Sequence, residues 1–482
     1  MVNYLPHIRF SLANRLFDFW HREINLISTM LAKLRIEPIV SIHLAALDRL
    51  LRLLSLRLLL SVILNLCCLV RLMPQVPTFS PMQQNVTNPI DIFDVIKRAL
   101  GKEDTFRSHN PQIGIRNASL LPIIGYSPAN GFVIGAAVGI TSLLGNSANT
   151  TISALLTNIS LTSKDQVLIN LRADIYTPGN EWIIKGDNRL LFFSQPTYGL
   201  GIYGLNNTYA FCLDGSSVDR TVGEQAMRFN YIRLYDAAVR KIYRNWYAGL
   251  GINFDFHYQI KDESLKLDTP NQYISSHYYY SKKYGFDTSH YSTDGLIIHF
   301  IQDSRDNSVN AYKGHFIDVG FRFNPTWLGS SQQSTMLYGE FRGYFNVQKS
   351  RPAHLVGVWF WGVLETGGYV PYLALPAITW DAYNRSGRGY IQGRFRGTNM
   401  VYGEVEYRVP LSQNGLFGAV IFANATTANN PITNQGLFNS LAPAGGFGLR
   451  IKLNKIDRTN ICVDFGIGQS FTGIYFNIRE AF

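Results

Sequence analysis

Charged side chains recur at alternate positions in several apolar stretches of this chain, and they are the residues whose chemistry needs explaining first. His299 and Asp303 lie four residues apart, so a histidine–carboxylate pair could act as a general acid or base. The sequence identifies no nucleophile beside them. It also contains no convincing G-x-S-x-G, H-E-x-x-H, P-loop or dinucleotide-binding motif. We therefore expect no catalytic residue, no metal site and no cofactor, and we predict that these charges satisfy one another. The other charges of this kind are Asp318 and Arg322, Glu340 and Arg342, and Arg450 and Lys452.

The densest such stretch is residues 386–411, SGRGYIQGRFRGTNMVYGEVEYRVPL. Its first half, rich in Gly and Arg, is typical of a loop, and its second half alternates strictly, as a strand does. One strand face carries Met400, Tyr402, Glu404, Glu406 and Arg408, and the other carries Val401, Val405, Tyr407 and Val409. Later strands repeat the pattern, and no second apolar layer exists to cover them. A barrel in lipid, with apolar side chains outward and charges in the lumen, satisfies both faces.

The composition also favours a transmembrane barrel. Only 16% of the residues are charged, 13% are aromatic and 41 are glycine, and the mean hydropathy is close to zero. Such a chain is too polar for a helical membrane protein and too poor in charge for a typical soluble one. About sixteen candidate strands follow residue 118, an even number as a single-chain bacterial barrel requires. Longer loops are expected at 195–222, 261–292 and 366–397. The predicted fold class is all-β, an antiparallel transmembrane barrel.

Two motifs in the 386–411 stretch resemble those of the BamA/TamA-type outer-membrane assembly superfamily. Arg388-Gly389-Tyr390 matches its R-G-[FY] loop, which folds back into a sixteen-stranded barrel, and Glu406-Tyr407-Arg408-Val409-Pro410 matches its E-[LY]-R-x-P strand. The resemblance covers roughly residues 118–482. It implies that Arg388 enters the lumen and pairs with acids on the wall, a pairing that would pin the loop. The candidate partners are Glu406, then Glu404, and Asp464. The acid that the family often carries on strand thirteen is Asn424 here, and a solvated Arg388 remains the alternative.

Two further segments resemble the same family. The run Asp303-Ser304-Arg305-Asp306-Asn307 with Lys313-Gly314 matches its turn between strands eight and nine. We interpret this turn as structural, with capping side chains and with Asp303 and Arg305 facing the lumen. At the C-terminal end, Ile474, Ile478 and Phe476 precede Phe482 at period two, which resembles the strand signal that outer-membrane proteins present to the assembly machinery. Glu480 departs from that signal.

The N-terminal part differs in character. Residues 1–75 are predicted to be a leader, because the thirteen-residue apolar run 58–70 follows several arginines and has the length of a signal-peptide h-region. An amphipathic N-terminal segment is the alternative. Residues 76–117 are predicted to be a periplasmic connector with one short amphipathic helix after Asn88-Pro89, and residues 118–482 the barrel. The connector has no room for the family's periplasmic docking domain, which is the main departure from the family.

Taken with the resemblance, these features predict a non-enzymatic barrel in the bacterial outer membrane. The expected function is to assist insertion or folding of outer-membrane components by opening a seam between the first strand (119–127) and the last (473–482). The expected partner is outer-membrane lipid, and the resemblance allows client outer-membrane proteins and a periplasmic partner; nucleic acid is not expected. The main alternative is a passive pore or translocation channel gated by the 366–397 loop, and an enzyme of the barrel rim is a third.

Overall fold

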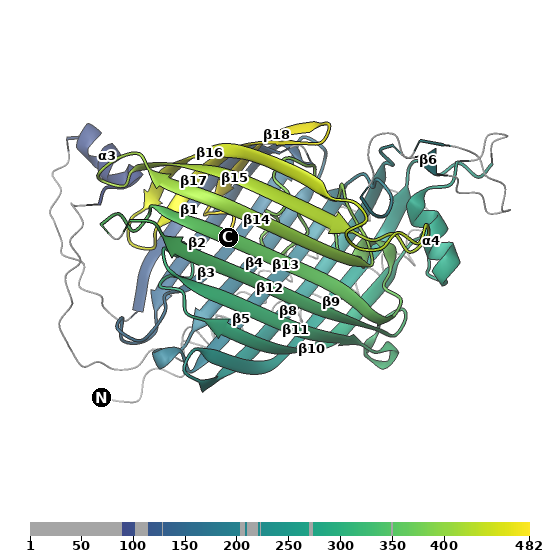
Figure 1. The fold of residues 1–482 in the computed structure, drawn as a ribbon, viewed down its shortest axis with the longest axis horizontal. Helices are drawn as coiled ribbons and strands as arrows, with labels where there is room; N and C mark the ends of the chain where they lie inside the picture. Colours follow the sequence, from purple (N-terminus) through teal and green to yellow (C-terminus); the bar gives the residue numbers. More distant parts are fainter. Residues whose placement is uncertain are drawn as a thin grey trace, which may run out of the picture. The chain divides into compact units, whose positions relative to one another are not determined.

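The computed structural model describes residues 89–101, 114–127, 129–202, 208–209, 220–221, 223–268, 273–348 and 350–482. The predicted leader, the first part of the connector, and Cys212 lie outside these residues. Sixteen strands of the described chain pair antiparallel in one sheet, in their order along the chain apart from β6 and β7. Figure 1 shows how these strands are arranged. The prediction of a sixteen-stranded antiparallel barrel is therefore confirmed.

The first eight strands of this sheet form one half of the wall. They are β1 (Gly114–Ser127), β2 (Gly131–Leu143), β3 (Ser153–Thr162), β4 (Val167–Tyr176), β5 (Trp182–Ser194), β8 (Met227–Tyr243), β9 (Trp246–Asp262) and β10 (Tyr291–Asp303). The other eight are β11 (Gly314–Asn324), β12 (Ser334–Asn346), β13 (Leu355–Gly368), β14 (Asn399–Pro410), β15 (Phe417–Ala428), β16 (Ala442–Asn454), β17 (Thr459–Gly468) and β18 (Phe471–Ile478).

The remaining elements lie in the connections. Helix α3 (Ile92–Ala99) precedes β1, and helix α4 (Ser276–Tyr284) lies between β9 and β10. Strands β6 (Thr208–Tyr209) and β7 (Arg220–Thr221) form a separate ribbon between β5 and β8. Single turns of 3-10 helix occur at η1 (Pro178–Asn180), η2 (Thr326–Leu328) and η3 (Tyr372–Ala374). None of the helices in the described ranges combines the length and the apolar character needed to cross a membrane.

The two faces of the wall differ as the alternation predicts. On β14 the inward Glu404 and Glu406 are 1% and 0% exposed, whereas the outward Val405 and Tyr407 are 44% and 41% exposed. Outward apolar residues elsewhere are still more open, with Ile124 of β1 79% exposed. Apolar side chains that a water-soluble protein would cover thus form the outer surface, which suits a lipid surround.

The connections differ at the two ends of the barrel. One end, here the loop end, carries the long connections 195–226, 263–290 and 369–398, together with α4. The other, the turn end, carries the shorter turns 411–416 and 455–458, together with α3 at the left of Figure 1. The connection 369–398, named the lumen loop below, is buried along much of its length.

Some predicted boundaries differ from the structure. β1 begins at Gly114, within the predicted connector 76–117 and before the predicted first strand 119–127. The loop expected over 261–292 corresponds to the connection between β9 and β10, but α4 within it was not predicted. Ser275 caps this helix by accepting a hydrogen bond from the amide of Tyr278, and Gly285 ends it in the left-handed conformation. The last strand was expected over 473–482, yet β18 ends at Ile478. Arg479 has a φ of 81°, which breaks the extended conformation and redirects residues 479–482, named the tail below.

Candidate functional site

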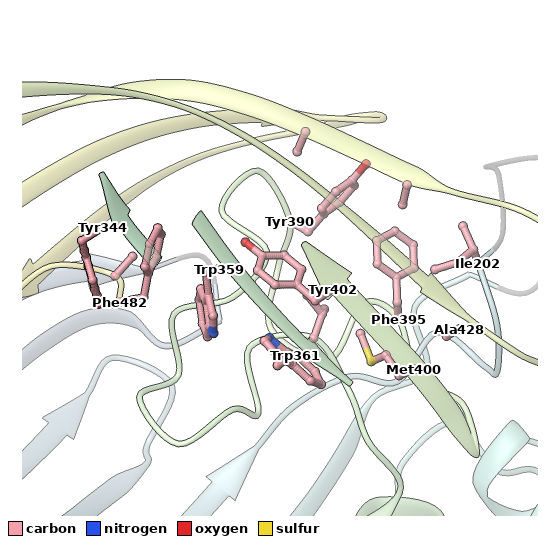
Figure 2. Packing of buried hydrophobic residues seen from close by; sticks show 14 of the residues in the cluster. Ile202, Tyr344, Trp359, Trp361, Tyr390, Phe395, Met400, Tyr402, Ala428 and Phe482 are labelled. Atoms are coloured by element: carbon pink, nitrogen blue, oxygen red, sulfur yellow. The ribbon is translucent and has the colours of Figure 1, made fainter. Parts of the chain in front are cut away.

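The lumen loop packs against the inner faces of β13 and β14. Figure 2 shows Tyr390 and Phe395 of the loop beside Tyr402 and Met400 of β14. All four side chains are 1% exposed or less, so this part of the loop is a packed element of the barrel interior. Since apolar contacts exclude water here, the polar groups of the loop need partners on the wall.

Arg388 has three carboxylate partners. Its Nη2 lies 2.6 Å from Glu404 Oε1 and also contacts Glu406 Oε1, and its Nη1 lies 3.0 Å from Asp464 Oδ2. The guanidinium stacks 3.8 Å from the ring centre of Phe422 on β15. The structure therefore brings Arg388 together with all three acids that the sequence nominated, from β14 and β17.

The charge cluster extends beyond Arg388. Arg408 on β14 lies 2.7 Å from Glu406, and Arg450 on β16 lies 2.6 Å from Asp464 and 2.7 Å from Glu480 of the tail. Three guanidinium groups and four carboxylates thus share one buried site, named the Arg388 cluster. Opposite charges that alternate in this way compensate one another's desolvation, and they connect the lumen loop, three strands and the tail.

Gly389 allows the loop backbone to lie directly on the wall. Its φ is 106°, and a Cβ there would lie 2.7 Å from Cβ of Ala444 and 3.0 Å from the carbonyl carbon of Ile467. The wall has matching glycines, since a Cβ on Gly466 would lie 2.6 Å from the Gly389 nitrogen and one on Gly468 would lie 2.4 Å from its oxygen. Glycine is needed on both sides of this contact because no side chain fits between the two backbones.

Tyr390 ties the loop to the last hairpin. Its hydroxyl donates to the carbonyl of Pro443 at 2.7 Å and accepts from the amide of Gln469 at 3.1 Å. The hydroxyl of Tyr475 on β18 accepts from the Gly389 amide at 3.0 Å and donates to the Tyr390 carbonyl at 2.8 Å. Each residue of the Arg-Gly-Tyr motif therefore has its own partners on the wall.

The lumen loop also reaches the opposite wall. Arg189 of β5 donates to Asn384 Oδ1 at 2.9 Å and to the carbonyls of Asp381 and Ala382, both at 3.1 Å. Arg396 holds the start of the loop by donating to the carbonyls of Tyr372 and Leu373 at 2.9 and 3.0 Å. Beside the loop is a cavity of about 250 Å³ lined by charged residues of β5, β9 and β11 and by Trp380 and Tyr383 of the loop.

The last strand and the tail diverge at Ile478. Ile474 and Phe476 are 44% and 48% exposed on the outer face of β18. Phe482, in contrast, is buried against Trp359 and Tyr344, with ring centres 5.5 and 6.1 Å away, as Figure 2 shows. The predicted period-two signal is thus split, with two residues facing outward and Phe482 inside.

Strands β1 and β18 face each other across the seam of the barrel. No ladder joins them among the described residues, although every other neighbouring pair in the sheet is paired. The strands are nevertheless close, because a Cβ placed on Gly125 would lie 3.6 Å from Cβ of Phe476. From the inside, Arg385 of the lumen loop donates to the carbonyl of Ile478 at 2.5 Å and also to that of Glu480.

The 303–314 turn is a closed structural unit. Asp303 accepts from Arg305 Nε at 2.9 Å and from the hydroxyl of Tyr176 at 2.9 Å. Asp306 accepts from the amide of Tyr312 at 2.9 Å, and Asn307 Oδ1 accepts from the amide of Val309 at 2.7 Å. Gly314 has a φ of 94°, and a Cβ there would lie 2.2 Å from the carbonyl oxygen of Ser304. These contacts fix the conformation of the turn, in agreement with a structural role.

Sequence reasoning missed several partners. His299 Nδ1 lies 2.9 Å from Asp318 on the neighbouring strand, not near Asp303, and Arg322 pairs with Asp255 at 2.9 Å. Glu480 appeared only as a departure from the strand signal. Its charge was the available indication that the tail leaves the lipid face, since an isolated carboxylate is costly in lipid.

Comparisons with known proteins find one family model and several solved structures that match this chain. The family model described as the Omp85 superfamily domain matches residues 206–468. Among solved structures, the chain is similar to BamA from Haemophilus ducreyi lacking POTRA domains 1-3, with 14% identity, a TM-score of 0.46, and coverage of 80% of this chain and 78% of that chain. It is also similar to CdiB from Acinetobacter baumannii, with 13% identity, a TM-score of 0.42, and coverage of 76% and 66%. CdiB from Escherichia coli follows, with 7% identity, a TM-score of 0.45, and coverage of 77% and 67%. No curated protein matches the sequence.

The family model spans more than half of the chain, including the lumen loop and the Arg-Gly-Tyr motif. The matched part runs from the connection before β8 to the end of β17. The chain therefore belongs to the Omp85 superfamily of outer-membrane β-barrels.

Proposed function

We propose that this barrel assists the insertion or folding of outer-membrane proteins by opening the seam between β1 and β18. Barrels of the Omp85 superfamily serve assembly and transport. The observation that carries the proposal is the missing ladder between these two strands in the described chain. Their edges keep backbone N–H and C=O groups available, and such edges pair readily with an incoming strand.

The interior contacts support a seam that opens without unfolding the barrel. The lumen loop is held to β14 and β17 by the Arg388 cluster, and to β5 by Arg189. These anchors do not involve β1. If β1 moves outward, the loop, the cluster and β18 can stay in place, so the cost of opening is confined to contacts across the seam.

The experiment locks the seam with a disulfide. In a background without native cysteines, G125C and F476C place two thiols on Cβ atoms about 3.6 Å apart, within the range of a disulfide. The barrel is reconstituted in vesicles, and a small urea-unfolded outer-membrane barrel is added as client. Its folding is followed by its heat-modifiable mobility on a gel. We expect the oxidised variant to lose insertion activity and the reduced variant to regain it.

A matched control ties β1 to its other neighbour. Gly125 and Val133 are register partners in the β1–β2 ladder, so G125C/V133C adds a disulfide of similar position and leaves the seam free. This control should retain activity when oxidised. Equal activity of the locked and reduced seam variants would refute the proposal and leave the passive pore or channel gated by the lumen loop, which single-channel conductance would then test.

A further inference from the structure

Helix α3 is attached to the barrel by its acidic side. Asp91 and Asp94 form a reciprocal capping box, with each side chain accepting from the other residue's amide at 3.1 and 3.0 Å. Lys455 of the β16–β17 turn donates to both, from its amide to Asp91 at 3.2 Å and from Nζ to Asp94 at 2.7 Å. The amide of Ile90 donates to the carbonyl of Asn414 in the β14–β15 turn at 3.1 Å. These contacts fix the helix at the turn end of the barrel.

The apolar side of α3 points away from the protein. Phe93, Ile96 and Leu100 follow the three- and four-residue spacing of one helical face, and they are 42%, 47% and 68% exposed. The one buried residue within the helix, Asp94, is instead acidic, as is the buried N-cap residue Asp91. A helix on a water-soluble domain has the reverse arrangement, with its apolar stripe on the core and its charges outside. The outer face of α3 therefore requires an apolar surround.

The lipid-facing surface of the barrel continues beside this face. Leu411 in the β14–β15 turn and Phe417 at the start of β15 are 62% and 49% exposed, next to the turn that holds Ile90. Leu449 on the outer face of β16, the strand that leads into the Lys455 turn, is 58% exposed. The last turn of α3 adds two basic side chains, Lys97 and Arg98, both exposed. The apolar face of α3 continues the lipid-facing surface of the barrel, and basic side chains border it. Both features indicate that an anionic lipid leaflet covers this face.

We propose that α3 lies in the membrane interface at the turn end, with Phe93, Ile96 and Leu100 among the upper acyl chains and with Lys97 and Arg98 toward lipid phosphates. An interfacial helix places its apolar face about 5–10 Å into this boundary. A helix of eight residues is too short to bind a membrane stably by itself, so the contacts to Lys455 and Asn414 are needed to keep α3 at the interface. The inference is independent of the proposed seam function.

The test measures what surrounds Ile96 in the full-length barrel in vesicles. A fluorescent NBD group is attached at I96C in a background without native cysteines, and quenching is compared for lipid-borne doxyl groups and aqueous iodide. I421C, on the outer face of β15 and 65% exposed, gives the lipid reference, and R351C in the β12–β13 turn gives the water reference. We expect the Ile96 label to match the Ile421 label.

The charge requirement is tested separately. In vesicles containing phosphatidylglycerol, K97E/R98E should shift the label from lipid toward water by about tenfold or more in the ratio of the two quenching responses. In phosphatidylcholine alone the substitution should have little effect. Equal effects in the two lipids would overturn the assigned preference for anionic headgroups.

Two outcomes at Ile96 itself would overturn the proposal. Quenching by iodide alone would place the face in water. Protection from both quenchers would mean that protein covers it, and the candidate is a segment of this chain among residues 1–88.

Discussion

At the residue scale, the most informative side chain is Arg388. It is 2% exposed and contacts three carboxylates from two strands. A buried ion pair adds little over a well-packed apolar core, but removal of one partner is costly because the remaining charges lose their compensation. Arg388 is therefore structurally important because its removal would leave three buried carboxylates without their compensating positive charge.

Replacement of Arg388 by alanine should therefore destabilise the barrel by about 3–5 kcal/mol. Lysine should restore only part of the loss, because an ammonium cannot bridge three acids as a planar guanidinium does. The measurement is urea unfolding of the refolded barrel in detergent micelles, followed by tryptophan fluorescence.

Arg394 provides the matched control for that measurement. It is another arginine of the lumen loop, it is only half-buried, and its side chain stacks on Tyr198 and Phe395. R394A should lower the free energy of unfolding by about 1 kcal/mol or less. If R388A and R394A have equal effects, the Arg388 cluster does not hold the loop.

The sequence pointed to the acids around Arg388 but not to the full cluster. Glu404 and Glu406 alternate on one strand close to the motif, so their side of the barrel follows from period two alone. Arg450 and Glu480 belong to other segments, and their meeting depends on which strands neighbour each other and on the turn at Arg479. Glu480 interrupts the apolar period between Ile478 and Phe482, but the period alone does not predict the positive φ at Arg479 that turns the backbone inward.

At the element scale, the strands and helix α3 follow from apolar periods in the sequence, whereas helix α4 does not. Each strand of the barrel carries its own alternation, so β9 or β14 can be located without knowing its neighbours. Helix α4, SHYYYSKKY, has no apolar stripe, and its signals are the cap at Ser275 and the stop at Gly285. Such local signals are common in loops, which explains why a loop was predicted there.

The attachment of α3 should depend on pH. Burial tends to raise the pKa of Asp94, but the hydrogen bond and charge of Lys455 outweigh it and lower the pKa below its usual value. A carboxylate with a lowered pKa stabilises the attached state above its ordinary pKa of about 3.9, and that stabilisation is lost as the pH falls through the lowered value. We expect α3 to stay attached at neutral pH and to be released in strong acid.

A nitroxide at A99C reports this release as a sharper electron paramagnetic resonance spectrum. D94N should already show the sharp spectrum at neutral pH. The control is D165N, which changes an exposed aspartate in the β3–β4 turn at the loop end. This variant should leave the spectrum of the A99C label unchanged. A broad spectrum for D94N at neutral pH would show that Lys455 and Asp94 do not hold the helix.

At the scale of the whole molecule, the seam between β1 and β18 is the weakest contact between neighbouring strands of the described barrel wall. Fifteen neighbouring pairs of the described sheet are joined by ladders, from β1–β2 to β17–β18, and the β1–β18 contact is not. We therefore expect the outer-edge amides of β1 and β18 to exchange hydrogen about tenfold or more faster than amides of β8 and β9. Hydrogen exchange with mass spectrometry in vesicles measures this difference.

The G125C/F476C disulfide should slow exchange on both edges, and G125C/V133C should not. Equal protection of β1 and β9 without any disulfide would mean that the seam is closed by hydrogen bonds in the membrane.

The unequal strand lengths have a consequence for the surrounding bilayer. β8 and β9 have 17 residues each, whereas β18 has 8. At about 3.4 Å per residue, β8 extends about 58 Å and β18 about 27 Å before tilt. A tilted β18 is thus shorter than a hydrocarbon core of about 30 Å, while β8 exceeds it. We expect lipids beside β18 to compress or disorder to match the wall, so that hydrophobic mismatch thins the bilayer beside the seam where no ladder joins β1 and β18.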